Sequence, residues 1–150
     1  MKLFKFDLTP AQMDMTKKQL DKLSYNVIGA AIEVHRILGP GLLEKVYQKC
    51  LARELTLRGI KFREQVKMPF DYKGEFVDLD LTFDFYIEES LVLEIKAVQE
   101  VIPLFHAQTL AYMKLLKAPK GIIINFNVTN IFHHGQKTFV NEYFENLMDE

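Results

Sequence analysis

The sequence predicts a mixed domain of the α/β or α+β class, with two helices, three strands, a helix and a strand in that order. Three observations predict this fold. Apolar residues recur at helical spacing before Gly39 and again up to Leu57, apolar and polar residues alternate between Ile60 and Val98, and a second helical stretch precedes the apolar run 122–124. With 150 residues, 49% of them hydrophobic, we expect a single domain over residues 1–150 with one substantial core.

The helices are predicted from their end signals. Thr9-Pro10 resembles a cap followed by proline at the first helical position, and Gly39-Pro40 stops that helix after Leu38. The polar first turns leave open whether they fray or form a separate piece. A second helix is expected from Gly41 to Leu57, and a third from Pro103 to Lys117.

The strands are predicted over Ile60–Tyr72, Glu75–Ile87, Leu91–Val98 and Gly121–Phe126, with Lys73-Gly74 as a tight turn between the first two. The last strand is apolar throughout, as in parallel pairing, so we expect a right-handed crossover that places it beside the third strand. The tail from Phe139 to Met148 is expected to form a short amphipathic helix.

Composition narrows the functional classes. The chain has 19 basic and 20 acidic residues, so any contact with nucleic acid has to come from a local patch. Cys50 is the single cysteine, which excludes an internal disulfide and fits a reducing compartment. The first residues, 1–6, lack the apolar segment of a secretory signal, and no apolar stretch approaches the roughly 20 residues of a membrane span. We therefore expect a cytoplasmic protein without a membrane partner.

Two neighbouring strands carry acidic residues near one another. Glu94 and Lys96 share a face of the third strand, and Asp84 lies on the polar face of the second. A turn centred on Glu89 would place Asp84 opposite Glu94, where two carboxylates repel unless a divalent cation binds them. A turn centred on Ser90 would instead pair Asp84 with Lys96, and the residue pattern leaves both registers open. In either case, the apolar residues of the second strand are expected on one face: Leu79, Leu81, Phe83, Phe85 and Ile87.

Helical residues supply further candidates, each with a plain structural alternative. Glu44, if Gly41 caps the second helix, suits its first turn, and Tyr47 suits a core aromatic with a satisfied hydroxyl. Gln108 and Tyr112 share one face of the third helix, where a surface glutamine is the simpler interpretation.

A basic stripe of Lys45, Lys49 and Arg53 runs along the second helix. Such stripes are usually solvated, although this one has the spacing to follow a phosphate backbone. The four histidines lack the spacing of a zinc site.

Several of these segments resemble the GxxExxY protein family, a branch of the PD-(D/E)XK nuclease superfamily, over about residues 23–137. The resemblance lies in an ordered set of motifs: Val34-His35-x-x-Leu38-Gly39-Pro40, Gly41-x-x-Glu44-x-x-Tyr47, Asp84, Glu94-x-Lys96-Ala97-Val98, Ala107-Gln108-x-Leu110-x-Tyr112 and Asn125-Phe126-Asn127-Val128. It implies a restriction-endonuclease-like αβββαβ core, with a mixed central sheet flanked by helices and an extra N-terminal helix. Phe83 stands where the superfamily has proline before its first aspartate.

The resemblance also implies roles. Asp84 and Glu94 would bind Mg²⁺ or Mn²⁺, and Lys96 would position or polarise the water. Glu44 would be an additional acid and Gln108 would orient the site, with Tyr47 and Tyr112 as supporting residues.

The sequence thus leads to the hypothesis of a metal-dependent nuclease acting on DNA or, less favoured, on RNA. A non-catalytic module that keeps the fold and binds nucleic acid or protein is the alternative. A homodimer also stays open, although the tail aromatics fit better against their own core.

Overall fold

The computed structural model describes residue 12 and residues 14–150, so the predicted cap at Thr9-Pro10 lies outside the described residues. The first long helix, α2, spans Lys17–Leu38. Thr16 caps it, because its side chain accepts a hydrogen bond from the Gln19 amide and the Gln19 side chain accepts one from the Thr16 amide. Gly39 ends the helix as predicted.

Helix α3 spans Glu44–Leu57 and begins later than the Gly41 start predicted from sequence. The Tyr47 hydroxyl donates a hydrogen bond to the Gly39 carbonyl (2.6 Å) and accepts one from the Leu42 amide (3.1 Å). These bonds hold the connection in a non-helical conformation, with Gly41 at a φ of 97°. Leu43 is therefore the N-cap and Glu44 the first helical residue, two positions earlier in the helix than expected.

Five strands form a mixed sheet flanked by helices, in the order β1-β2-β3-β4-β5. Their bounds are Phe62–Tyr72 for β1, Glu75–Ile87 for β2, Leu91–Lys96 for β3, Lys120–Asn125 for β4 and Gln136–Val140 for β5. Helix α4, Pro103–Leu116, connects β3 to β4, and these two strands are parallel as predicted. The other neighbours are antiparallel.

The chain after β4 differs from the sequence prediction. A π-helical turn, η2, spans Ile131–Gly135, then β5 pairs with β4, and only the four residues Glu142–Glu145 form the helix α5. The predicted tail helix from Phe139 was therefore wrong in its first part, because Val140 still pairs with Lys120 in the sheet. Leu147 is buried and Tyr143 packs on the same core, so the tail covers its own domain.

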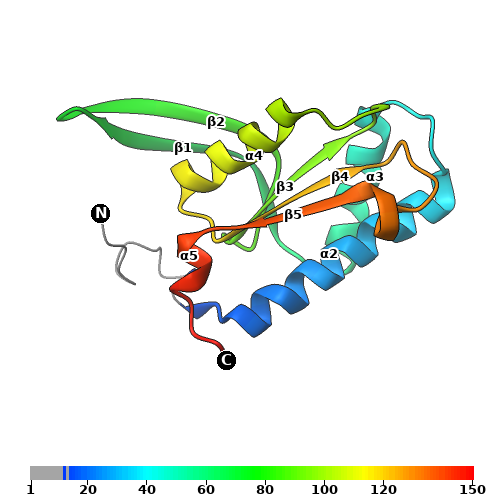
Figure 1. The fold of residues 1–150 in the computed structure, drawn as a ribbon, viewed down its shortest axis with the longest axis horizontal. Coiled ribbons are helices and arrows are strands. Elements are labelled where there is room, and N and C mark those ends of the chain that lie inside the picture. The colour runs from blue at the N-terminus through cyan, green and yellow to red at the C-terminus, as the bar shows by residue number, and fades with distance from the viewer. Residues whose placement is uncertain (1–11, 13) are drawn as a thin grey trace.

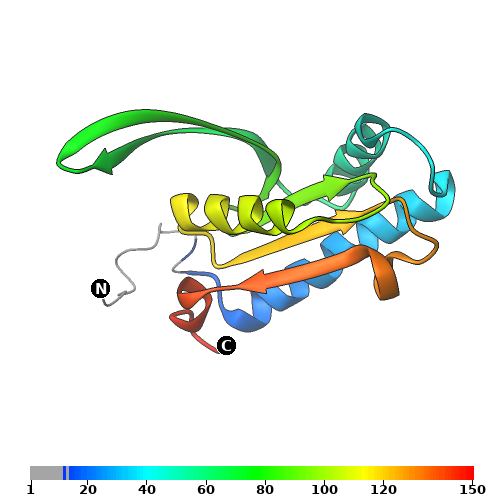
Figure 2. The same ribbon diagram turned by 45° about the horizontal axis from the view of Figure 1, so that its top comes forward.

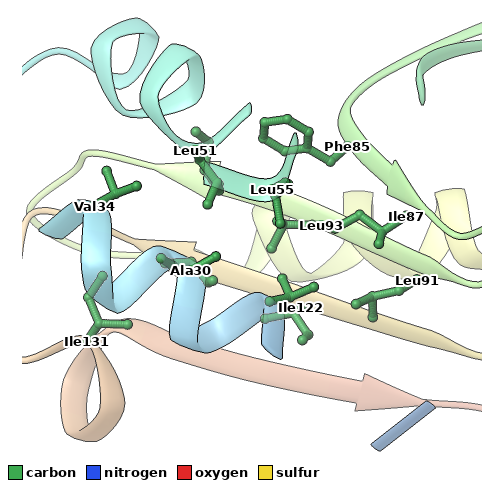
Figure 3. Close-up of a cluster of buried hydrophobic side chains, with 14 of the residues drawn as sticks. Ala30, Val34, Leu51, Leu55, Phe85, Ile87, Leu91, Leu93, Ile122 and Ile131 are labelled. Atoms are coloured by element: carbon green, nitrogen blue, oxygen red, sulfur yellow. The ribbon is translucent and has the colours of Figure 1, made fainter. Parts of the chain in front are cut away.

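The helices cover opposite faces of the sheet, as Figures 1 and 2 show for α2 and α4. The larger apolar cluster joins α2 and α3 to the sheet, and Figure 3 shows part of it. Its members include Ala30, Val34, Leu51, Leu55, Phe85, Ile87, Leu91, Leu93 and Ile122. A second cluster lies under α4 and contains Val66, Leu81, Phe83, Tyr86, Val92, Met113, Leu116 and Ala118. None of the helices in the described part of the chain combines the length and apolar character that a membrane crossing needs.

Strand β2 changes faces along its length, contrary to the sequence prediction. Between the pairs Arg63–Tyr86 and Gln65–Thr82 the register shifts, so that one residue of β1 faces three residues of β2. Such an irregularity bends a strand and re-aims its side chains. Phe85 consequently belongs to the α2 and α3 side, whereas Phe83 packs on the α4 side against Tyr112 at 5.7 Å between ring centroids.

Beyond this irregularity, β1 and β2 continue as a two-stranded arm that leaves the sheet (Figures 1 and 2). Lys73 and Gly74 form its tip with φ values of 55° and 92°, which matches the predicted tight turn. Only the base of the arm packs on α4, through Val66 and Leu81. The bend therefore separates β2 from β3 where Asp84 lies.

Gly121 allows α4 to approach β4 closely. A Cβ atom at this position would lie 2.5 Å from the Met113 sulfur and 2.9 Å from the Thr109 methyl carbon. Both of these side chains are buried, so they have little room to move.

We expect Gly121→Ala to destabilise the protein by about 1–3 kcal/mol, because the added methyl group overpacks the contact between α4 and β4. Urea unfolding followed by circular dichroism measures this. Gly29→Ala in α2 is the matched control and should be neutral or stabilising, since alanine favours a helix interior. Equal unfolding midpoints for wild type and Gly121→Ala would contradict the close approach.

Candidate active site

Asp84 and Glu94 lie opposite each other where the pairing of β2 with β3 ends. The paired residues are Ile87–Leu91, Tyr86–Val92 and Phe85–Leu93, which is the register with its turn centred on Glu89. The next position in this register joins Asp84 and Glu94. The alternative register, with Asp84 opposite Lys96, is therefore wrong.

Side chains replace the backbone ladder beyond Phe85. The Ile95 amide donates a hydrogen bond to Oδ2 of Asp84 (2.8 Å), and the Asp84 amide lies 3.4 Å from Oε1 of Glu94 as a weaker donor. The carboxylate of Asp84 is thus fixed by the backbone of β3 and lies beside the side chain of Glu94.

Glu94 is an acid in an unfavourable place for charge. Its residue is only 5% exposed, and burial raises the pKa of its carboxyl group to about 8. The charge of Asp84 and a hydrogen bond between the two side chains also raise this pKa, while Lys96 lowers it. Ionisation of both Asp84 and Glu94 is therefore unfavourable in the absence of a cation.

Lys96 reaches the same area from the end of β3 and is half-buried. Its Nζ lies 4.1 Å from the centroid of the Phe105 ring in the first turn of α4, a cation–π contact. The ion pairs among the described residues involve other lysines and arginines. Lys96 is thus held by an aromatic ring, with its charge unpaired next to two acids.

Glu44, the first residue of α3, lies within electrostatic reach of the two strands. Partial burial raises the pKa of its carboxyl group, the charge of Asp84 raises it further, and Lys96 lowers it. The helix start therefore brings a third acid toward Asp84 and Lys96, as the sequence motif suggested.

Gln108 and Tyr112 lie next to each other on α4, as their spacing predicted. Burial raises the pKa of the Tyr112 hydroxyl, followed by the charge of Glu94, while a hydrogen bond with Gln108 lowers it and Asp84 raises it. The Tyr112 hydroxyl donates a hydrogen bond to the Thr82 carbonyl (2.8 Å) and so ties α4 to β2. Gln108 itself is exposed, and in the described part of the chain it makes no hydrogen bond to either carboxylate.

Tyr47 lies on the opposite face of the sheet, in the core that joins α2 and α3 to the strands. It is fully buried, and its ring stacks on Phe126 at 4.5 Å between centroids. The Phe126 amide in turn donates a hydrogen bond to the Lys96 carbonyl (2.8 Å). Tyr47 thus connects the loop before Glu44 to the end of β3.

Sequence reasoning missed two residues that shape this site. Phe105 was not proposed as a site residue, although an aromatic residue early in the helix that follows the acidic strand was a signal for it. Asn125 was noted only as part of a motif. Its side chain donates a hydrogen bond to the Val98 carbonyl (2.8 Å) and accepts one from the Val98 amide (3.1 Å), so it fixes the loop that follows Lys96.

The basic stripe on α3 is exposed at all three positions, Lys45, Lys49 and Arg53. None of the three forms an ion pair among the described residues. The stripe starts one residue after Glu44 and extends along α3 away from Asp84 and Glu94. We refer to these three side chains as the basic ridge.

Comparison with known proteins adds an independent observation. A family profile described as the PD-(D/E)XK nuclease superfamily matches residues 21–138, which include Glu44, Asp84, Glu94 and Lys96. The chain belongs to the PD-(D/E)XK nuclease superfamily. A search of curated proteins and a search of solved structures each gave no match. The mixed sheet flanked by helices is consistent with the restriction-endonuclease-like fold of this superfamily.

The residues present fit the divalent metal that PD-(D/E)XK nucleases generally use. The donor set is two carboxyl groups on adjacent strands, and oxygen ligands of this kind suit Mg²⁺ or Mn²⁺. Among the described residues no group of three or more His, Cys, Asp or Glu side chains forms a cage for an ion. Asp84 and Glu94 would therefore hold a cation together with water, as Mg²⁺ commonly requires.

A hollow of about 710 Å³ lies away from the acids, near the turn between β2 and β3, and is lined by residues such as Ile60, Phe62 and Glu89. At the acids themselves, Asp84 is half-buried and Glu94 is buried.

Glu94→Gln should stabilise the metal-free protein at alkaline pH. The folded-state pKa of Glu94 is raised, so its stabilising contribution is complete below the unfolded value of 4.5 and is lost as the pH rises to about 8. We expect Glu94→Gln and wild type to be similar near pH 4.5 and to differ by about 1–3 kcal/mol in favour of the variant at pH 9.

Thermal unfolding in EDTA at a series of pH values measures this difference. Glu75→Gln in the exposed arm is the matched control and should follow the wild-type curve. If the melting temperatures of Glu94→Gln and wild type depend on pH in the same way, ionisation of Glu94 does not destabilise the folded protein and the prediction is wrong.

Proposed function

We propose that this protein is a divalent-metal-dependent nuclease that hydrolyses phosphodiester bonds of DNA, with RNA as the less favoured substrate. The observation that carries the proposal is the meeting of Asp84, Glu94 and Lys96 at the end of two adjacent strands, within a chain of the PD-(D/E)XK nuclease superfamily. We further propose that it belongs to the GxxExxY branch, on the motifs around Glu44 and Tyr47.

Asp84 and Glu94 are the proposed ligands of Mg²⁺ or Mn²⁺. When bound, the ion supplies positive charge to the scissile phosphate and lowers the pKa of a coordinated water. The hydrogen bond from the Ile95 amide fixes the orientation of the Asp84 carboxylate before any ligand arrives, which supports its role as a ligand.

Lys96 is the proposed group that positions the attacking water or stabilises the developing negative charge. Its contact with Phe105 holds the ammonium group next to the acids without an ion pair that would have to be broken. Glu44 is proposed as an additional acid that accepts a proton or orients water at the α3 side of the site. Gln108 is proposed to orient substrate from α4, since its side chain is exposed beside Tyr112.

The form of the surface supports a polymeric substrate. Asp84 and Glu44 are half-buried, and the exposed basic stripe of Lys45, Lys49 and Arg53 begins next to Glu44. Lysine and arginine side chains along a groove or ridge are the usual means of holding a phosphate backbone.

Glu94→Gln and Lys96→Ala should each lower the rate of nucleic-acid cleavage in Mg²⁺ or Mn²⁺ by about 100-fold or more, because each removes a group at the reacting phosphate. Cleavage of supercoiled, linear and single-stranded DNA and of RNA, followed on gels, measures this. Wild type should be inactive in EDTA.

Metal binding gives a second readout of the same proposal. Millimolar Mg²⁺ should raise the melting temperature of wild type by mass action, and Asp84→Asn, which keeps an oxygen for the Ile95 amide, should not respond. Glu100→Gln in the exposed loop after β3 is the control for both assays. An inactive wild type that also fails to respond to metal would favour the non-catalytic module.

The basic ridge of Lys45, Lys49 and Arg53 should contribute to DNA binding and not to the cleavage step. We expect the triple variant Lys45→Ala, Lys49→Ala, Arg53→Ala to bind DNA more weakly and to reduce the slope of log affinity against log salt by about two to three. Fluorescence anisotropy in EDTA measures this. A triple variant of exposed lysines elsewhere, at Lys18, Lys22 and Lys114, is the control, and equal salt slopes for both triple variants would contradict the ridge.

A further inference from the structure

We propose that a basic hollow lined by His106, His134 and Lys137 binds a backbone phosphate of the nucleic-acid strand, a few nucleotides from the phosphate at Asp84 and Glu94. The hollow has a volume of about 100 Å³ and lies at the ends of β4 and β5. The inference rests on the proposed nuclease function. It specifies the path of the nucleic-acid strand beyond Asp84 and Glu94.

The sheet register places this hollow on the same face as the acids. Glu94 pairs with Ile123 on β4, and Ile123 pairs with Lys137 on β5. Residues directly opposite each other share a face of a sheet, so the three side chains form a row. Neighbouring strands lie about 4.8 Å apart, which puts the backbone of Lys137 about 10 Å from that of Glu94.

Helix α4 connects the hollow to the proposed catalytic lysine. Phe105, which contacts Lys96, and His106, which lines the hollow, are adjacent in the first turn of this helix. The same turn therefore borders both places. Because Ile123, between Glu94 and Lys137, is buried, a nucleic-acid strand leaving the acids would cross this turn of α4 to reach the hollow.

The chemistry of the hollow favours an anion. Its lining contains no Asp or Glu, and none of its three basic side chains forms an ion pair among the described residues. His106 packs edge-on against Phe139 at 5.4 Å between centroids, and the Lys137 Nζ lies 5.9 Å from the same ring. His106 and Lys137 therefore both lie against the ring of Phe139.

The π-helical turn η2 presents the third donor. Gly135 packs so tightly that a Cβ atom there would lie 2.7 Å from the Asn125 carbonyl oxygen. This close approach brings the preceding residue, His134, to the end of β4 with its side chain exposed. π-Helical turns are rare and are frequently found at functional sites.

A phosphate of a nucleic-acid backbone fits this arrangement better than a larger anion. The hollow is small, its donors come from three separate elements, and it lies within reach of a strand that already contacts the acids. Histidine and lysine donate hydrogen bonds to phosphate oxygens without reading sequence, so the hollow would fix the path of the strand rather than the identity of its bases.

The test measures binding of a fluorescently labelled single-stranded DNA oligonucleotide by anisotropy in EDTA, where cleavage is absent. The double variant His134→Ala, Lys137→Ala should bind about tenfold more weakly than wild type and should reduce the salt slope by one to two. The double variant Lys18→Ala, Lys22→Ala removes exposed lysines from α2 on the other face of the sheet and should bind like wild type. If the His134 and Lys137 double variant is folded and binds with wild-type affinity and slope, the proposal is wrong.

A second measurement identifies the ligand directly and uses wild-type protein. The imidazole NMR signals of His106 and His134 should shift on adding the oligonucleotide at micromolar concentration and should need far higher concentrations of inorganic phosphate. If the histidine signals shift at the same concentrations of oligonucleotide and of inorganic phosphate, the hollow is a site for free anions and the proposal is wrong. The proposal is also wrong if the signals do not shift. Neither measurement involves cleavage or metal, so their failure is distinguishable from failure of the nuclease assay.

Discussion

The hydrogen bond from the Ile95 amide to the Asp84 carboxylate is the interaction on which the site depends. An antiparallel pair normally satisfies such amides with backbone carbonyls. Here a side chain takes over, because the residues of β2 that precede Phe85 bend away from β3. The bend coincides with the shifted register between β1 and β2. One irregularity in the sheet therefore separates the strands, turns Phe83 toward α4 and leaves Asp84 facing Glu94.

The end of β3 is held from three other directions. Asn125 fixes the loop after Lys96, the Phe126 amide bonds to the Lys96 carbonyl, and Tyr47 stacks on Phe126 from the α3 side. These contacts link the start of α3, which carries Glu44, to the strand that carries Glu94 and Lys96. Functional groups placed on elements fixed in this way keep their geometry without help from a ligand. The sequence motifs around Tyr47 and Asn125 thus have a structural explanation of their own.

The sequence predicted much of this arrangement because it depends on local patterns. Alternation and a short polar turn narrowed the partner of Asp84 to Glu94 or Lys96, and the family resemblance favoured Glu94. The apolar run in β4 was enough to propose its parallel pairing with β3. The bend in β2 was beyond such reasoning, since its alternation continues unbroken through Phe83 and Phe85 while the backbone changes faces. Strand β5 was missed because Gln136–Val140 is short and follows a π-helical turn with no common sequence signal. Phe105 was missed because its partner, Lys96, comes from another element.

The near-zero net charge of −1 gave no indication of nucleic acid, and the structure shows why this average misleads. Acidic residues outnumber basic ones on the β1–β2 arm, where Asp71, Glu75, Asp78 and Asp80 are exposed beside Lys67 and Lys73. Basic side chains without ion pairs among the described residues lie on the two flanks of the site, along the stripe on α3 and around the hollow beside β5. Association with a phosphate backbone depends on the local potential over about a Debye length, roughly 8 Å at physiological salt, rather than on the sum over the chain. A protein with a slightly negative net charge can therefore still present basic side chains on both sides of the acidic pair Asp84 and Glu94.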